Sequence, residues 1–198
     1  LVGISGCDKS LPGTIMAMAR LNLPSIFVYG GTILPGTWNG KQVTIQDVYE
    51  AVGSFEAGKI NLEDLKDLEN VACPSSGSCG GMYTANTMAC ISEALGIALP
   101  GSASPPKKKK KRNEICYETG KQIFNLLENN VRPKDILTFE AFENAIAIAN
   151  AIGGSTNAIL HLLAISKEIR VHLDLKDFER IRKATPHLAD TRPGGMYV

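Results

Sequence analysis

The 198-residue chain has no long apolar run and almost no excess of charge of one sign. A membrane-spanning helix would need about 18 consecutive apolar residues. The 21 Lys and Arg residues nearly balance the 20 Asp and Glu residues, which leaves a formal net charge of +1. Balanced charge argues against a general binder of nucleic acid or of acidic substrates. We therefore expect neither a membrane nor a nucleic acid among the partners.

Cysteine is scarce, with five residues in the chain, and none of them stands in a CxxC pair. The zinc-ribbon pattern is thereby excluded, and the low cysteine density argues against a disulfide-built secreted scaffold. Cys90 and Cys116 fall on helical patterns, and we interpret both as buried apolar residues. Cys7 and Cys79 differ from them, because both stand in glycine-rich loops at the start of predicted helices.

The first residues also lack the features of a signal peptide. Residues 1–4 (LVGI) carry no positive charge and no initiator Met, and we interpret them as a strand cut in the middle. The composition, with 44% hydrophobic and 21% charged residues, is that of an ordinary globular protein. We expect one domain over residues 1–198.

The most informative feature that is present is the tripeptide Cys7-Asp8-Lys9. It places a soft sulfur, a hard oxygen and an amine side by side in a glycine-flanked loop. Ser10 and Pro12 predict a helix start, because Ser caps free backbone N–H groups and Pro suits the first turn. The positive end of the helix dipole favours anionic ligands in the loop. Thiolate suits iron–sulfur clusters or zinc and carboxylate suits magnesium, so the tripeptide could contact two metal centres.

Two further loops repeat this design. Cys73 and Cys79 lie in a glycine-rich loop before a helix predicted over residues 82–95. Residues 153–157 (GGSTN) separate two apolar helical segments, and the glycines permit a close backbone approach. We interpret this segment as a packing or anion-binding loop near the site.

The order strand, helix, strand in the first 30 residues indicates an α/β fold, with strands at 1–5 and 25–29. We expect a three-layer, largely parallel, doubly wound sheet with helices on both faces. Ligands of such sheets bind beyond the carboxyl ends of the strands, where the Cys7 loop would lie. The remaining helices are predicted at 45–55, 62–70, 114–129 and 175–182, with a pair around Gly153.

Six consecutive positive charges, Lys107 to Arg112, interrupt this composition. Because like charges repel, we expect a basic, solvated loop over residues 102–113. The alternative is a nuclear-localisation or nucleic-acid patch, which the net charge of +1 disfavours.

The remaining polar candidates have a structural interpretation beside a functional one. His161 lies on an apolar helix, and we interpret it as a packed or half-exposed histidine rather than a ligand. His172 and His187 have no partner at metal-ligand spacing. Three residues near the start of the helix over 82–95 could contact a substrate or cap the helix: Thr84, Asn86 and Thr87.

Taken together, these stretches resemble the dihydroxy-acid dehydratase family, which also holds phosphogluconate and sugar-acid dehydratases. The similarity runs through nearly the whole chain in order. It rests on GCDKSLPGTIMAMARLN (6–22), GGTILPG (30–36), CPSSGSCGGMYTANTM (73–88), ALPG (98–101), FENAIAIANAIGGSTNAILHLLAI (142–165) and TPHLADTRPGG (185–195). The resemblance implies removal of water from a 2,3-dihydroxy acid to give a 2-keto acid.

The resemblance also implies roles for single residues. Cys7 and Cys79 match cysteines that hold an iron–sulfur cluster, a two-iron rather than a four-iron cluster. Asp8 matches a magnesium ligand, and Lys9 matches a lysine that is carboxylated on its amine and binds the same Mg²⁺. The family's third cluster cysteine, further magnesium ligands and serine base have no match here. We therefore expect no catalytic residue within residues 1–198, which would be a partial N-terminal metal- and cluster-binding domain without the C-terminal barrel domain.

The implied pathway is the biosynthesis of the branched-chain amino acids valine and isoleucine, and the implied partner is a small dihydroxy acid. Two alternatives stay open: a sugar-acid dehydratase of the same family, and a non-catalytic α/β binding domain whose cysteines are structural. We expect a homodimer, in the cytoplasm of a bacterium or in the mitochondrion or plastid of a eukaryote.

Overall fold

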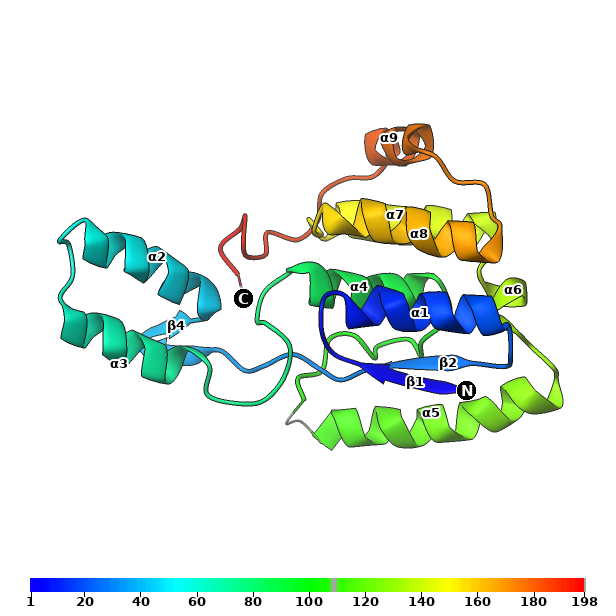
Figure 1. Ribbon diagram of the computed structural model, residues 1–198, viewed down its shortest axis with the longest axis horizontal. Coiled ribbons are helices and arrows are strands. Elements are labelled where there is room, and N and C mark those ends of the chain that lie inside the picture. The colour runs from blue at the N-terminus through cyan, green and yellow to red at the C-terminus, as the bar shows by residue number, and fades with distance from the viewer. Residues whose placement is uncertain (108–109, 198) are drawn as a thin grey trace.

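The computed structural model describes residues 1–107 and 110–197, which form a mixed α/β fold made mostly of helices (Figure 1). The strands are β1 (Val2–Ser5), β2 (Ile26–Tyr29), β3 (Gly36–Trp38) and β4 (Lys41–Val43). The helices are α1 (Ser10–Leu21), α2 (Ile45–Glu56), α3 (Leu62–Ala72), α4 (Thr84–Ala94), α5 (Lys110–Glu128), α6 (Pro133–Ile136), α7 (Phe139–Ala151), α8 (Asn157–Ile169) and α9 (Leu175–Ala184). Among the described residues, no helix is both long and apolar enough to span a membrane.

The expected doubly wound sheet does not form within the described residues. β1 and β2 pair in parallel, from Val2 opposite Ile26 to Ser5 opposite Tyr29. One isolated parallel bridge joins Phe27 of β2 to Ala98. The chain between β2 and this bridge forms a hairpin and helices, so the parallel sheet stays at two strands. The prediction of a parallel start was right, but its extension to a large sheet was wrong.

The second sheet is an antiparallel hairpin of β3 and β4, which the sequence analysis did not predict. Its turn is Asn39-Gly40, and both residues have positive φ angles, 49° and 75°. Asn-Gly is the residue pair that a two-residue hairpin turn favours, because both positions need a left-handed backbone. This signal was therefore present in the sequence, although strands of three residues are too short for a periodic pattern.

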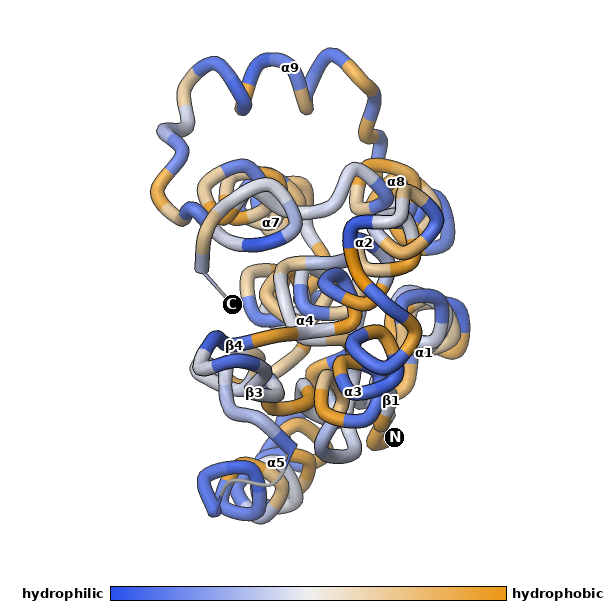
Figure 2. Tube along the Cα trace, turned by 90° about the vertical axis from the view of Figure 1, so that its left-hand side faces the viewer, coloured by the Kyte–Doolittle hydropathy of each residue, from blue (hydrophilic) through white to orange (hydrophobic). Residues whose placement is uncertain are grey.

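Helices cover both faces of the β1–β2 pair, as Figure 1 shows. α5 lies against one face, and α1 and α4 lie against the other. α7 and α8 pack on α4 and α1, and α9 packs on α7 at the outside. Figure 2 shows α9 as largely hydrophilic, in keeping with this outer position.

Two apolar clusters hold these layers. The larger lies between β2 and the four helices α1, α4, α7 and α8, and its fully buried side chains include Leu11, Ile15, Met18, Phe27, Tyr29, Met88, Ile91, Leu95, Phe142, Ile146, Leu162 and Ile165. The smaller joins the hairpin to α2 and α3 through Val43, Ala51, Leu65, Leu68 and Ala72. The hairpin unit thus has its own small core, and in Figure 1 it extends away from the stacked helices.

Most predicted helices lie within a few residues of their expected positions, because their start signals are local. Asn61 accepts the backbone N–H of Asp64 at 2.9 Å, and Thr44 and Asp47 form the corresponding capping box at the start of α2. The helix predicted from residue 82 begins at Thr84.

The basic tract differs from its prediction as a solvated loop over residues 102–113. α5 begins at Lys110, so the last third of this segment is helical. Lys108 and Lys109 lie outside the described residues. The loop was expected because like charges repel, but successive residues of a helix do not face one another, so a helix also keeps these charges apart.

Arg112 of this tract is buried, with 4% of its surface exposed. Its guanidinium donates to the carbonyl oxygens of Tyr29 at 2.9 Å and Ser102 at 2.6 Å, and also to that of Pro105. It lies 5.5 Å from the centroid of the Tyr29 ring. Burial lowers the pKa of Arg112. This arginine therefore ties α5 to the carboxyl end of β2 instead of facing solvent.

Candidate functional site

The loop of residues 6–9 connects the carboxyl end of β1 to α1. Lys9 occupies the N-cap position without a side-chain cap, and Ser10 is the first helical residue. The Ser10 hydroxyl accepts from the Cys7 N–H and donates to the Cys7 carbonyl oxygen, both at 3.0 Å. The prediction that Ser10 caps the free N–H groups of the helix was therefore wrong. Ser10 instead fixes the backbone of Cys7, because a hydroxyl can accept one bond and donate another.

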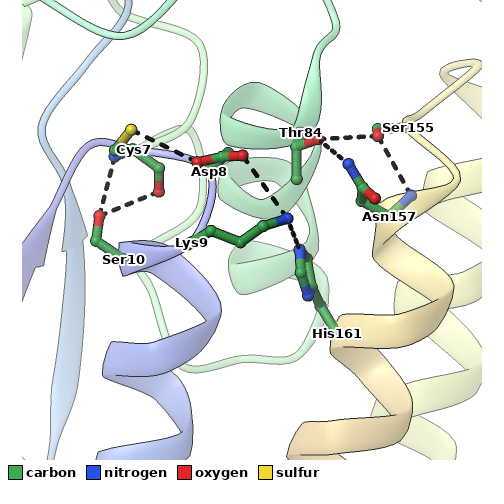
Figure 3. Close-up of polar contacts among 8 residues, drawn as sticks. All are labelled: Cys7, Asp8, Lys9, Ser10, Thr84, Ser155, Asn157 and His161. Atoms are coloured by element: carbon green, nitrogen blue, oxygen red, sulfur yellow. Dashed lines mark hydrogen bonds and ion pairs between the residues drawn. The ribbon is translucent and has the colours of Figure 1, made fainter.

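The side chains of the tripeptide form a short chain of contacts, drawn in Figure 3. Cys7 Sγ lies 3.6 Å from Asp8 Oδ1, and Asp8 Oδ2 lies 3.7 Å from Lys9 Nζ. The side chain of Asp8 is 47% exposed and that of Lys9 is 64% exposed. Cys7 is exposed as well. The thiol, the carboxylate and the amine therefore lie together at the surface and not in the core.

The loop of Cys79 touches the loop of Cys7 through the residues that precede the two cysteines. Ser78 pairs with Thr32 in a parallel bridge beyond the end of β2. From there the Ser78 hydroxyl donates to the carbonyl oxygen of Gly6, across 72 positions of sequence. The structure therefore brings together the two cysteine loops that the sequence analysis singled out.

Asn86 of α4 anchors the Cys79 loop. Its amide nitrogen donates to the carbonyl oxygen of Cys79 at 3.1 Å and to that of Gly81. Thr32 Oγ1 donates to the same Cys79 oxygen at 3.1 Å, and the Tyr29 hydroxyl donates to Asn86 Oδ1 at 2.5 Å. Burial raises the pKa of Tyr29 to about 12, so its hydroxyl keeps the proton that it donates. Asn86 thus holds the backbone of a cysteine rather than capping α4.

The other three cysteines lie in different environments. Cys73 is exposed and ends α3. Cys90 of α4 is half-buried against the larger core, and burial raises its thiol pKa to about 11. Cys116 is exposed on α5, so the interpretation of Cys116 as a buried residue was wrong. Its helical position was right, but its side chain is open to solvent in a hollow that Tyr29 and Arg112 also line.

The GGSTN segment packs against the start of α4 (Figure 3). Thr84 Oγ1 lies 2.9 Å from Ser155 Oγ and accepts from the Asn157 side-chain amide at 2.9 Å. The Ser155 N–H donates to Thr87 Oγ1 at 3.0 Å. At Gly154 an added Cβ would lie 2.8 Å from Thr87 Cγ2, so this approach requires glycine. The packing role predicted for the segment is visible in these contacts.

His161 of α8 reaches the tripeptide, which the sequence analysis did not predict. Its Nε2 lies 3.5 Å from Lys9 Nζ, and the ring is half-buried (Figure 3). Burial lowers the pKa of His161, the charge of Lys9 lowers it further, and that of Asp8 opposes the change. The prediction of a half-exposed histidine was right, but the contact joins residues 152 positions apart, which no local pattern encodes.

The whole chain, residues 1–198, matches the family model described as Dihydroxy-acid/6-phosphogluconate dehydratase N-terminal. The chain belongs to the dihydroxy-acid/6-phosphogluconate dehydratase family. The Dihydroxy-acid dehydratase of Sulfurisphaera tokodaii is 60% identical over 197 residues, which cover 100% of this chain and 35% of that protein. That of Pelagibacter ubique is 58% identical over 198 residues, again 100% of this chain and 35% of the relative. Dihydroxy-acid dehydratase 2 of Bradyrhizobium diazoefficiens is 55% identical over 198 residues, 100% of this chain and 34% of the relative. The chain spans about a third of the length of these curated relatives.

The donor types in this dehydratase-family chain match two kinds of inorganic group. Within residues 1–107 and 110–197, no three His, Cys, Asp or Glu side chains gather as a group that could hold a metal ion. The sulfurs of Cys7 and Cys79 suit iron, and the carboxylate of Asp8 suits magnesium. The exposed position of Asp8 beside Lys9 leaves its oxygens open to an added ligand. These residues fit part of a cluster site and part of a magnesium site.

Proposed function

We propose that the full-length protein is a dihydroxy-acid dehydratase, a hydro-lyase that converts 2,3-dihydroxy carboxylic acids to 2-keto acids in valine and isoleucine biosynthesis. Residues 1–198 would be part of its N-terminal metal- and cluster-binding domain. The observation that carries the proposal is the contact between the Cys7 and Cys79 loops through Ser78 and Gly6. It puts two candidate cluster ligands on loops that meet, with Asp8 and Lys9 beside one of them.

The reaction needs help at its leaving group. A base takes the proton from C2, the C3–O bond breaks, and the departing hydroxide takes up a proton and leaves as water. The resulting enol then tautomerises to the 2-keto acid. Hydroxide is a poor leaving group, so its oxygen must be bound by a Lewis acid. An iron–sulfur cluster and Mg²⁺, when bound, would supply this Lewis acidity and hold the substrate carboxylate and C2 hydroxyl.

Within this chain, each proposed site residue has one task. The thiolates of Cys7 and Cys79 hold the cluster, for which we propose two irons rather than four. The carboxylate of Asp8 holds Mg²⁺. Asn86 and Ser10 keep the two cysteine backbones in place through the hydrogen bonds described above. We assign no base to residues 1–198.

Lys9 can bind Mg²⁺ only after its side chain has lost its positive charge. As an ammonium group it would repel the cation. We propose that its neutral amine adds to the carbon of CO₂, which forms one N–C bond and releases one proton to solvent. The product is a carbamate with one negative charge. Because Asp8 Oδ2 lies 3.7 Å from Lys9 Nζ, the carbamate and the carboxylate could bind the same ion.

Assay of the full-length protein, purified without oxygen and loaded with iron, sulfide and Mg²⁺, tests this function. We expect kcat/KM for 2,3-dihydroxyisovalerate to exceed that for 6-phosphogluconate, because the relatives described above carry the dihydroxy-acid name. A preference for 6-phosphogluconate would favour the sugar-acid alternative, and loss of both activities would refute the proposal. Sedimentation of the same sample tests the homodimer that we propose. The compartment, cytoplasm or organelle, depends on the source organism.

A further inference from the structure

We propose that His161 is a positioning residue for Lys9, which holds the end of that side chain where it can bind Mg²⁺ after carboxylation. The inference rests on the proposed function, because it assumes that Lys9 is carboxylated. It adds a residue from α8 to a site otherwise built from the loop of residues 6–9 and the Cys79 loop. The carrying observation is the 3.5 Å distance between His161 Nε2 and Lys9 Nζ (Figure 3).

The backbone of His161 is held opposite Lys9 by the packing of α8 on α1. Leu162 and Ile165 of α8 are fully buried, and so are Ile15 and Met18 of α1, all within one cluster. Closely packed side chains of this kind permit little sliding between two helices. The imidazole therefore projects from a rigid support and not from a mobile loop.

A second contact fixes the other end of the same helix pair. Arg20 donates to Glu168 through two nitrogens, Nε at 2.9 Å and Nη2 at 2.7 Å. A paired contact between guanidinium and carboxylate has a defined geometry as well as attraction. Arg20 lies in the last turn of α1 and Glu168 lies near the end of α8, while Lys9 and His161 stand nearer the starts. The two contacts together fix how far one helix is shifted along the other.

Lys9 needs such a partner because its own position gives it little restraint. Its side chain is 64% exposed, and its ion pair with the adjacent Asp8 spans 3.7 Å. An imidazole suits both forms of the lysine. A ring nitrogen without a proton accepts from the amine, and a ring N–H donates to a carbamate oxygen. His161 can thus hold Lys9 before carboxylation and hold the carbamate afterwards.

The alternative is that His161 only fills space between α8 and α1. In that case its replacement would change the stability of the fold but leave the chemistry of Lys9 unaltered. Three variants of the full-length protein separate these roles. His161→Leu removes both ring nitrogens, His161→Gln keeps a polar group near the place of Nε2, and His172→Leu changes an exposed histidine outside the site.

The first measurement is the carbamate itself. Full-length protein, before cluster loading, is equilibrated with ¹³C-bicarbonate and Mg²⁺, and the carbamate carbon is followed by ¹³C NMR, with Lys9→Arg as the blank. Mg²⁺ affinity is measured by calorimetry on the same samples. We expect His161→Leu to lower the carbamate signal and to weaken Mg²⁺ binding by about 10-fold to 100-fold, the usual range for a residue that supports a metal ligand. His161→Gln should recover part of both, and His172→Leu should match the wild type.

The outcomes separate the role of His161 from the carboxylation of Lys9. Equal carbamate occupancy and Mg²⁺ affinity in His161→Leu and the wild type would overturn the role of His161 and leave the proposed function intact. If the wild-type protein shows no ¹³C carbamate signal beyond that of the Lys9→Arg blank, both the carboxylation of Lys9 and the role of His161 are refuted. Thermal unfolding of each variant identifies loss of fold. If His161→Leu fails to fold, His161→Phe decides, because it keeps an aromatic ring but no ring nitrogen, and wild-type carbamate occupancy and Mg²⁺ affinity in that variant would contradict positioning.

Discussion

At the scale of single residues, the candidate site depends on contacts between neighbours in sequence and on contacts across long separations. The sequence shows Cys7, Asp8 and Lys9 side by side, and their donor types indicate metal chemistry without any structure. It does not show that Ser78 reaches Gly6 or that His161 reaches Lys9. These pairs meet only because β2, α1, α4 and α8 pack around one core.

The first prediction concerns Asp8 in the full-length protein. Asp8→Asn should abolish turnover and leave the visible absorbance of the cluster unchanged, because the amide removes a charge from the proposed Mg²⁺ site but no cluster ligand. Steady-state assay and absorbance spectra measure the two effects. Asp67→Asn, an exposed change on α3, is the control and should keep full activity. Unchanged activity in Asp8→Asn would refute a role of Asp8 in binding magnesium.

The second prediction concerns the buried Arg112. Arg112→Met should lower the free energy of unfolding by about 2–4 kcal/mol, because it leaves buried carbonyl oxygens without their donor. Urea unfolding of the chain measures the loss. Lys111→Met, at the exposed neighbouring position, should change stability by less than about 0.5 kcal/mol. If the two variants were equally stable, the three hydrogen bonds of Arg112 would make no net contribution to the free energy of unfolding.

At the scale of helices and strands, signals that act within one turn of the chain predicted where helices begin. Features that depend on residues distant in sequence were not predicted. The helices predicted from residues 45 and 62 begin there as α2 and α3, and the capping residues Thr44 and Asn61 are local signals, because a cap acts within one turn. The number of strands in the parallel sheet depends on distant partners, and the expected doubly wound sheet was wrong for that reason. The buried Arg112 was missed likewise, since a run of charges carries no sign of which one a fold will bury.

The third prediction tests the close packing of the GGSTN segment on α4. Gly154→Ala should destabilise the fold by about 1–3 kcal/mol, because the added Cβ would lie 2.8 Å from Thr87 Cγ2 and 3.0 Å from Ala149 O. Gly120→Ala, on α5, meets no atom within 4 Å and should instead stabilise by about 0.5–1 kcal/mol. Urea unfolding compares both with the parent chain. Equal changes in the free energy of unfolding of the two variants would contradict the packing described for Gly154.

At the scale of the whole molecule, the described residues form a stacked helical body and a hairpin unit with a core of its own. The site lies on the body, at the carboxyl end of β1, which is where the sequence analysis placed it. Family membership extends through residues 1–198, yet the chain covers only about a third of its relatives. The activity is therefore a property that we propose for the full-length protein.

The fourth prediction follows from this difference in length. The 198-residue chain by itself, loaded anaerobically with iron, sulfide and Mg²⁺, should give no keto acid from 2,3-dihydroxyisovalerate. It offers two proposed cluster cysteines, two proposed magnesium ligands and no assigned base. Loss of a positioned base alone usually costs several orders of magnitude in rate. Turnover comparable to that of the full-length protein would place the base within residues 1–198 and contradict the roles proposed here.

The most direct test of the central claim is the iron and acid-labile sulfide content of full-length cysteine variants purified without oxygen. If Cys7 and Cys79 hold one cluster, Cys7→Ala and Cys79→Ala should each lose most iron and sulfide. Cys73→Ala and Cys116→Ala, which change exposed cysteines on α3's end and on α5, should retain the wild-type content. Wild-type iron and sulfide in Cys7→Ala or Cys79→Ala, or an equal loss in Cys73→Ala, would contradict a cluster held where the two loops meet.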